Sequence, residues 1–144
     1  MYHPHPSDKL NDIFTVKPYQ GVAPEHASFI FIGLDANYDA QIESHPIFPK
    51  ILEYHHNGLA FWQKYKVHHP FIVPGYTGDG KLYHRSFAKI GFQPEHAGMV
   101  SFAELLHVPT SGRSKLEVKD LSKSHLNRLN DAIIDGQAKY IFIP

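Results

Sequence analysis

The sequence contains no cysteine. This absence excludes disulfide-stapled folds, thiolate zinc sites, cysteine-held iron–sulfur clusters and cysteine nucleophiles. The chain also lacks an apolar run long enough to span a membrane, and residues 1–6 show no charged-then-apolar signal pattern. We therefore expect a cytoplasmic protein with no membrane partner.

No sign of charge dominates, because 14 Lys and Arg residues balance 14 Asp and Glu residues. The balance provides no global positive field to attract nucleic acid. The 12 histidines include the neighbours His55 and His56 and the neighbours His68 and His69. Side chains adjacent in sequence point apart on a helix or strand, so neither pair is a chelate by itself. No metal site and no cofactor are expected.

A continuous apolar run, Phe29 to Ile32, leads into Gly33 and an acidic turn that carries Asp35, Asn37 and Tyr38. Such a run ended by glycine is typical of a strand buried on both faces of a parallel sheet. Open α/β sheets bind their ligands just beyond the carboxyl ends of these strands. Asp35 is therefore a candidate catalytic carboxylate. The alternative is that it only accepts hydrogen bonds from its own turn.

Strand and helix patterns alternate along the rest of the chain. We predict a strand at 28–33, two short helices within 47–66 that meet at Asn57-Gly58, a helix over 83–90, a strand over 97–106, a helix over 120–134 and a third buried strand at 140–143. This alternation predicts a three-layer α/β/α fold with a central parallel sheet.

Domain boundaries follow from the same pattern. Residues 1–27 contain several prolines and little periodicity, which indicates an N-terminal arm in which Ser7 caps one or two helical turns. One α/β domain then covers residues 28–144. Because its third strand closes the sequence, we expect a domain truncated after that strand.

Three segments share their order and spacing with a known family. They are Gly33-Leu34-Asp35-Ala36-Asn37-Tyr38, Gly58-Leu59-Ala60-Phe61-Trp62 and the stretch 100–110 with the sequence VSFAELLHVPT. In these segments, and over roughly residues 28–144, the chain resembles the uracil-DNA glycosylase superfamily, particularly its mismatch-specific branch. The resemblance implies hydrolysis of the N-glycosidic bond of uracil or of a mismatched or damaged base in DNA.

The resemblance also implies roles for individual residues. Asp35 would orient water or stabilise the sugar cation, and Phe61 would stack on the flipped-out base. Tyr38 and Asn37 would lie at the base pocket. For Phe61, ordinary packing in a helix core is the alternative interpretation. In the loop that follows, Ser111 and Arg113 are candidates for phosphate contacts, with a plain solvated loop as the alternative.

Two departures from the family limit the expected activity. Ala36 stands where the family usually has proline. In the family a His-Pro-Ser type loop follows a fourth strand, and the sequence ends before such a strand. Without a second motif to stabilise the departing base, we expect the chain alone to be weak or inactive. The principal alternative function is a catalytically inactive nucleic-acid or protein-binding module of the same fold. A small-molecule α/β enzyme that uses the same loop is a third possibility.

Overall fold

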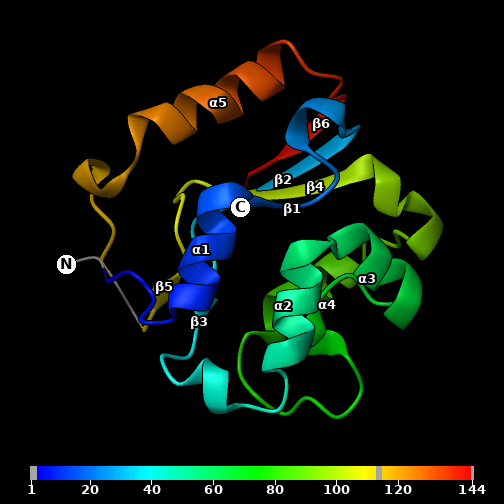
Figure 1. Ribbon diagram of the computed structural model, residues 1–144. Helices are drawn as coiled ribbons and strands as arrows, with labels where there is room; N and C mark the ends of the chain where they lie inside the picture. Colours follow the sequence, from blue (N-terminus) through cyan, green and yellow to red (C-terminus); the bar gives the residue numbers. More distant parts are fainter. Residues whose placement is uncertain (1–2, 113–114, 144) are drawn as a thin grey trace.

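The computed structural model describes residues 3–112 and 115–143, which form five helices and six strands (Figure 1). The helices are α1 (Asp8–Val16), α2 (Phe48–His56), α3 (Gly58–Tyr65), α4 (Lys81–Ala88) and α5 (Lys123–Ile134). The strands are β1 (Tyr19–Gly21), β2 (Phe29–Gly33), β3 (Asn37–Tyr38), β4 (Val100–Glu104), β5 (Thr110–Ser111) and β6 (Tyr140–Phe142). Single 3-10 turns include η1 (Pro24–His26), η3 (Pro70–Ile72) and η4 (Pro94–Met99).

The central sheet has the strand order β1-β4-β2-β6. Strand β2 pairs in parallel with β4 and β6, and β1 pairs antiparallel with β4. The chain is thus a mixed α/β protein with a mostly parallel sheet, compatible with three α/β/α layers. The antiparallel strand comes from the segment expected to be an arm, so residues 1–27 contribute to the sheet itself.

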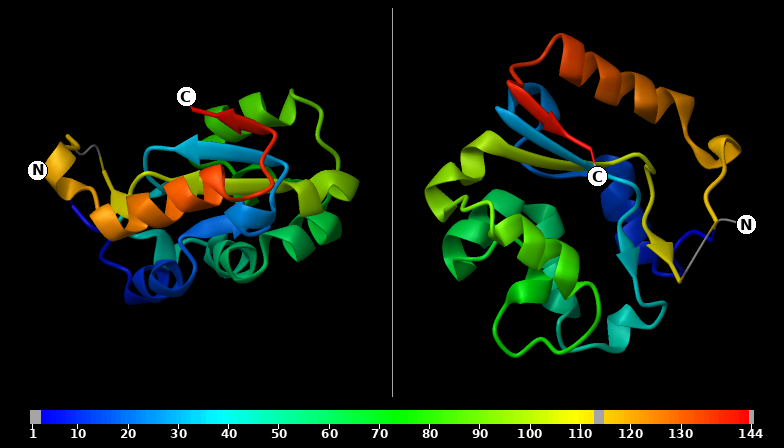
Figure 2. Two further views of the ribbon diagram at one scale, coloured as in Figure 1. Left: turned by 90° about the horizontal axis from the view of Figure 1, so that it is seen from above. Right: turned by 180° about the vertical axis from the view of Figure 1, so that it is seen from behind.

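Helices lie on both sides of this sheet. The connections that follow β2 and β4 run on opposite sides, and this divergence determines where a ligand site can form. Figures 1 and 2 show α2, α3 and α4 on one side and α5 on the other. The chain therefore leaves β2 toward one face and leaves β4 toward the opposite face. Adjacent parallel strands with such diverging connections open a crevice at their carboxyl ends. Beyond these ends, the short strands β3 and β5 continue the pairing, with Asn37 opposite Thr110.

The two faces of the sheet bury different side chains, because successive residues of a strand point to opposite sides. Ile30, Ile32 and Ala103 pack with Leu129 of α5. Their neighbours in sequence face the other helices, where the core consists largely of aromatic rings, namely Phe31, Trp62 and Phe87 together with Ala97 and Val100.

Polar caps begin several helices, including the Ser7 cap that the sequence predicts. The Ser7 hydroxyl accepts a hydrogen bond from the Leu10 amide at the start of α1, and the Ser122 hydroxyl accepts one from His125 at the start of α5. Asn57 ends α2 and caps α3, since its side chain accepts from the Ala60 amide. The predicted pair of short helices that meet at Asn57 is confirmed.

The third predicted strand is present as β6, but the prediction that it is buried is wrong. Tyr140 is 58% exposed and Phe142 is 42% exposed. The reason is its position: β6 pairs with β2 along one edge and has no further partner strand among the described residues. An apolar run by itself does not distinguish a central strand from such an edge strand.

Candidate functional site

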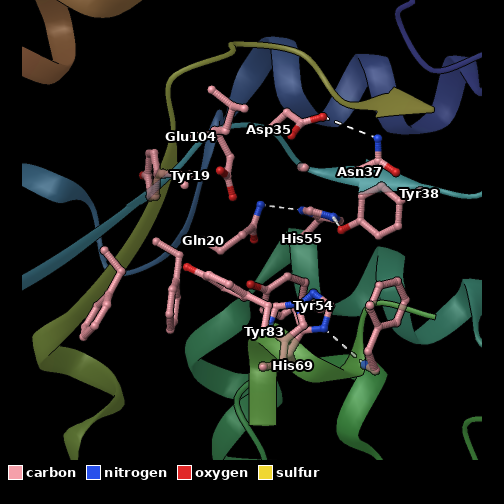
Figure 3. A pocket seen from close by; sticks show the side chains of 18 of the residues that line it. Tyr19, Gln20, Asp35, Asn37, Tyr38, Tyr54, His55, His69, Tyr83 and Glu104 are labelled. Carbon is pink, nitrogen blue, oxygen red and sulfur yellow. Dashed lines mark hydrogen bonds between the residues drawn. The ribbon is translucent and has the colours of Figure 1, made fainter. Parts of the chain in front are cut away.

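A cavity of about 350 Å³ lies at the carboxyl ends of β2 and β4 (Figure 3). The sheet supplies one wall with Gln20, Phe31, Gly33, Phe102 and Glu104. Helices α2 and α4 and turn η3 supply the opposite wall with Tyr54, His55, His69, Phe71, Tyr83 and His84. Mostly aromatic walls with a few converging polar groups are typical of sites for small planar ligands.

Asp35 lies on this cavity, two residues beyond the end of β2. Its Oδ2 atom accepts a hydrogen bond from the Thr110 hydroxyl and a longer one, 3.4 Å, from the Asn37 side chain. The Asn37 amide also donates to the Thr110 hydroxyl oxygen at 2.8 Å and to the Gly112 carbonyl at 2.7 Å. The paired strands β3 and β5 thus hold the Asp35 carboxylate in one orientation.

Glu104 is a second carboxyl group in the cavity, at the last position of β4. Figure 3 shows its carboxyl group pointing into the space between the walls. Its backbone partner in β2 is Gly33, and a Cβ atom built at Gly33 would overlap the Glu104 carboxyl group. Glycine therefore leaves room for the carboxyl group in its present position, and a larger residue would require the Glu104 side chain to move.

The environment of Glu104 keeps it protonated. The residue is half-buried as a whole, but its Oε2 atom is enclosed and has no hydrogen-bond partner among the described residues. Burial, with a smaller contribution from the negative charge of Asp35, raises the pKa of the Glu104 carboxyl to about 8. At neutral pH Glu104 is therefore a neutral carboxylic acid that can donate a hydrogen bond, and it lies in the same cavity as the carboxyl group of Asp35.

Gln20, His55 and Tyr38 form a buried hydrogen-bonded row along the cavity. The Gln20 side-chain nitrogen contacts His55 Nδ1, and the Tyr38 hydroxyl lies 2.6 Å from His55 Nε2. Burial lowers the pKa of His55 to about 3, so the imidazole is neutral. Burial also raises the pKa of the Tyr38 hydroxyl far above its usual range. Gln20, His55 and Tyr38 are therefore all uncharged at physiological pH.

Three further histidines pack together near the floor of the cavity. The rings of His69 and His84 stack with centroids 3.4 Å apart, and His68 Nε2 lies 3.3 Å from His84 Nδ1. Burial lowers the pKa of His68 and of His84 to about 3, and it lowers that of His69 well below the usual value. Within the described residues, no group of three or more His, Asp or Glu side chains is arranged to hold a metal ion.

The structure brings Asp35, Asn37 and Tyr38 together at the cavity as the sequence predicts. Their contacts are more specific than the prediction, because Asn37 positions Asp35 and Tyr38 contacts His55. The carboxylate of Asp35 does receive a bond from its own turn. Its hydrogen bond from Thr110 comes from a distant part of the chain, so Asp35 does more than accept hydrogen bonds from its own turn.

Phe61 does not line the cavity, which corrects its expected placement. It is 1% exposed and packs edge-on against Tyr54, with ring centroids 5.7 Å apart. The reason is that α3 turns this side chain toward α2, so Tyr54 stands between Phe61 and the cavity. Tyr54 itself is a cavity-lining aromatic residue that the sequence did not single out.

Ser111, one of the two predicted phosphate contacts, lies apart from the cavity. Ser111 lies in β5 opposite Tyr38, and its backbone amide contacts the His3 carbonyl at 3.4 Å. It is not part of the cavity wall. Arg113 lies outside the described residues.

Glu104 and Gln20 are the functional candidates that the sequence did not reveal. For Glu104 a signal exists, since it is the only charged residue in the apolar stretch 100–106. A lone acidic residue at the carboxyl end of a buried strand is unusual unless it has a function. For Gln20 no comparable signal exists, because β1 spans only Tyr19–Gly21.

Comparison of the chain with protein-family models, with curated proteins and with solved structures gave no match. No helix in the described part of the chain is long and apolar enough to cross a membrane.

Proposed function

We propose that the chain is a DNA glycosylase-like protein of the uracil-DNA glycosylase type, which hydrolyses the N-glycosidic bond of uracil or of a mismatched or damaged base. The observation that carries this proposal is the pairing of Asp35 with the protonated Glu104 in one aromatic cavity. A volume of about 350 Å³ accommodates a flipped-out base with part of its sugar.

The two carboxyl groups suit the two charges that develop during base excision. The bond between the sugar C1′ and the base nitrogen breaks, and a bond forms between C1′ and the oxygen of water. Asp35 stabilises the positive charge on the sugar and accepts the proton that water loses. The O–H group of Glu104 donates a hydrogen bond to the base as negative charge develops on it. This role of Glu104 supplies the donor that the sequence appeared to lack.

A basic groove beside the cavity supports DNA as the partner. Lys81 and Arg85 of α4, together with Lys89 directly after its end, line a groove of about 600 Å³. The groove shares Phe71 with the cavity wall, and α4 also contributes Tyr83 to the cavity. A base in the cavity would therefore place its flanking phosphates near these cations. Binding of a single-stranded oligonucleotide should weaken steeply with salt concentration.

The direct test is excision of uracil from single- and double-stranded oligonucleotides. We expect release of uracil by the wild-type chain and a loss of about 10²- to 10³-fold in rate for Asp35→Asn, the range typical of a removed transition-state contact. Asp39→Asn is the matched control, because Asp39 is an exposed acidic residue of the same turn that does not line the cavity.

The outcomes separate the two functions under consideration. Background-level excision by the wild-type chain, or equal rates for wild type and Asp35→Asn, contradicts the glycosylase proposal. Salt-dependent binding of oligonucleotides without excision identifies the alternative, a catalytically inactive nucleic-acid-binding module of the same fold.

A further inference from the structure

Strand β6 leaves one edge of the central sheet open. It is the last strand in the order β1-β4-β2-β6, and among the described residues it pairs with β2 alone. Figure 2 shows it as the outermost strand, next to β2. The Tyr140 amide donates to the Ser28 carbonyl, on the side of β2, at 3.2 Å. Because successive residues of a strand direct their backbone groups to opposite edges, the Phe142 amide also faces β2, whereas the N–H and C=O groups of Ile141 and Ile143 face the open edge.

Residues 140–143 carry none of the features that keep natural edge strands from pairing. Natural edges are usually covered, or they contain charged side chains, proline or a bulge. Residues 140–143 are instead all apolar or aromatic, and their exposed fractions range from 39% for Ile141 to 72% for Ile143. The open edge therefore presents backbone hydrogen-bonding groups beside apolar side chains, and a further strand would satisfy both.

A row of aromatic rings ends at this edge. Phe102 of β4, Phe31 of β2 and Phe142 of β6 lie opposite one another in the register of the sheet. The Phe31 and Phe142 rings are stacked with centroids 4.5 Å apart, and Phe142 is still 42% exposed. Side chains that lie opposite one another share a face of the sheet. A strand that pairs with the open edge should therefore continue the row with an aromatic side chain opposite Phe142.

The sequence of β6 itself meets this requirement. When two copies of β6 run antiparallel around a two-fold axis, Phe142 can lie opposite its counterpart and Ile141 opposite Ile143 of the second copy. The outward-facing Ile141 and Ile143 then form the hydrogen-bonded pairs, which exchange N–H···O=C bonds in both directions. The two Phe142 residues form the closer, non-hydrogen-bonded pair, in which aromatic side chains stabilise each other. No charged residue lies within 140–143 and the chain has no net charge, so charge repulsion does not oppose the pairing.

We propose that the open edge of β6 is a dimerisation surface, at which two copies of this chain join their sheets through an antiparallel pair of β6 strands. Because each copy uses the same edge, this assembly closes at two chains. The strands are short and the contact is small, so we expect a concentration-dependent dimer with a Kd of roughly 10–100 μM. This inference goes beyond the proposed function and does not depend on it.

The test is sedimentation velocity of the wild-type chain at concentrations from about 5 μM to about 1 mM. We expect the mass to rise from that of a monomer to that of a dimer, with no larger species. Amide hydrogen exchange, followed by NMR over the same concentrations, locates the contact. Exchange at Ile141 and Ile143 should slow as the dimer forms, whereas the amides of Tyr140 and Phe142, which face β2, should already be protected in the monomer.

Two variants at one position separate backbone pairing from apolar contact. Ile143→Pro removes an N–H group that faces the open edge and leaves the hydrogen bonds to β2 in place. Each dimer then loses two hydrogen bonds, so the Kd should rise at least about fivefold. Ile143→Val is the matched control, because it keeps the N–H group and a β-branched side chain, and it should dimerise like the wild type. Thermal unfolding of the dilute proteins checks that both variants are folded.

A wild-type chain that stays monomeric at every concentration overturns the proposal, and so do assemblies larger than a dimer. Equal Kd values for Ile143→Pro and Ile143→Val also overturn it. Slowed exchange at other residues, without a change at Ile141 and Ile143, would place the contact on another surface and overturn it as well. None of these measurements involves DNA, so the dimer and the excision of uracil are tested separately.

Discussion

The two faces of the central sheet are built from the same strands but have opposite chemistry. On the α5 face, Ile30, Ile32 and Ala103 form a compact aliphatic cluster. On the cavity face, the alternate positions of the same strands carry Phe31, Gly33, Phe102 and Glu104. The α5 face stabilises the fold through burial of apolar area. The cavity face buries polar groups, which lower the free energy of unfolding.

The difference between the two faces of the sheet indicates where function resides. Buried carboxyl, amide and imidazole groups lower stability unless they are paired, so their concentration on one face needs a reason other than folding. Ser101 Oγ is the exception on the aliphatic face, where it is buried without a partner. We expect changes on the α5 face to alter stability alone, and changes on the cavity face to alter pH dependence and ligand binding.

The largest expected effect is acid unfolding driven by the cavity face. His55, His68, His69 and His84 have pKa values lowered by burial, to about 3 for three of them. They stay neutral in the fold while the unfolded chain gains protons below pH 6.5. Stability therefore falls as pH decreases from 6.5 toward 3, by roughly 5 kcal/mol per pH unit if all four resist protonation. Circular dichroism should show unfolding near pH 5.

A pair of variants assigns this acid sensitivity to the buried rings. His68→Phe keeps an aromatic ring against Phe87 and Phe102 but removes a titrating group, so its acid midpoint should move to lower pH. His26→Gln, at an exposed position, should leave the midpoint unchanged. A wild-type protein that remains folded at pH 3.5 would contradict the expectation that buried neutral histidines destabilise the fold at low pH.

The next effect concerns the aliphatic face. Ile30 is fully buried under α5, and Ile30→Ala should lower the free energy of unfolding by about 2–4 kcal/mol, because a cavity replaces the side chain. The rate of uracil excision should not change. Urea denaturation checks the first expectation, with Val16→Ala at a position that is 86% exposed as the control. A changed rate of uracil excision in Ile30→Ala would show that the two faces are coupled.

The smallest effect is a gain of stability at the cavity. The raised pKa of Glu104 means that the folded state retains a proton that the unfolded chain releases above pH 4.5. This residue therefore reduces stability progressively as pH rises from 4.5 to 8. The full shift corresponds to roughly 4 kcal/mol at pH 8. Because Glu104 is only half-buried, solvent screening reduces the expected gain in stability of Glu104→Gln to roughly 2 kcal/mol at pH 8 and to almost nothing at pH 4.5. Equal effects at both pH values would place the Glu104 carboxyl in a solvated environment instead.

The parts of the fold that could be predicted from sequence depend on local signals. Apolar Phe29 to Ile32 followed by Gly33 predicts β2, and Asn57-Gly58 predicts the boundary between α2 and α3. Asp35 follows from the general position of ligand sites at strand ends. These inferences need only residues that are close in sequence. The structure has β2, the boundary between α2 and α3, and Asp35 at the expected places.

The remaining features depend on pairing between distant segments. The space that Gly33 leaves for Glu104 exists only in the register that aligns β2 with β4. Phe61 and Tyr54 are both aromatic residues on helices, and only the packing of α3 against α2 decides which one reaches the cavity. Strand β1 is too short to produce a period-two pattern, so the sequence does not predict that Gln20 lies in the sheet.

The pairing of β1 with β4 also has a consequence for the order of folding. Gln20 is synthesised long before Phe102, its partner across the antiparallel pair. During translation, the first strand of the chain therefore waits unpaired until almost the whole sheet has emerged, since non-local contacts form late. The cavity wall that contains Gln20 is then among the last parts of the molecule to close.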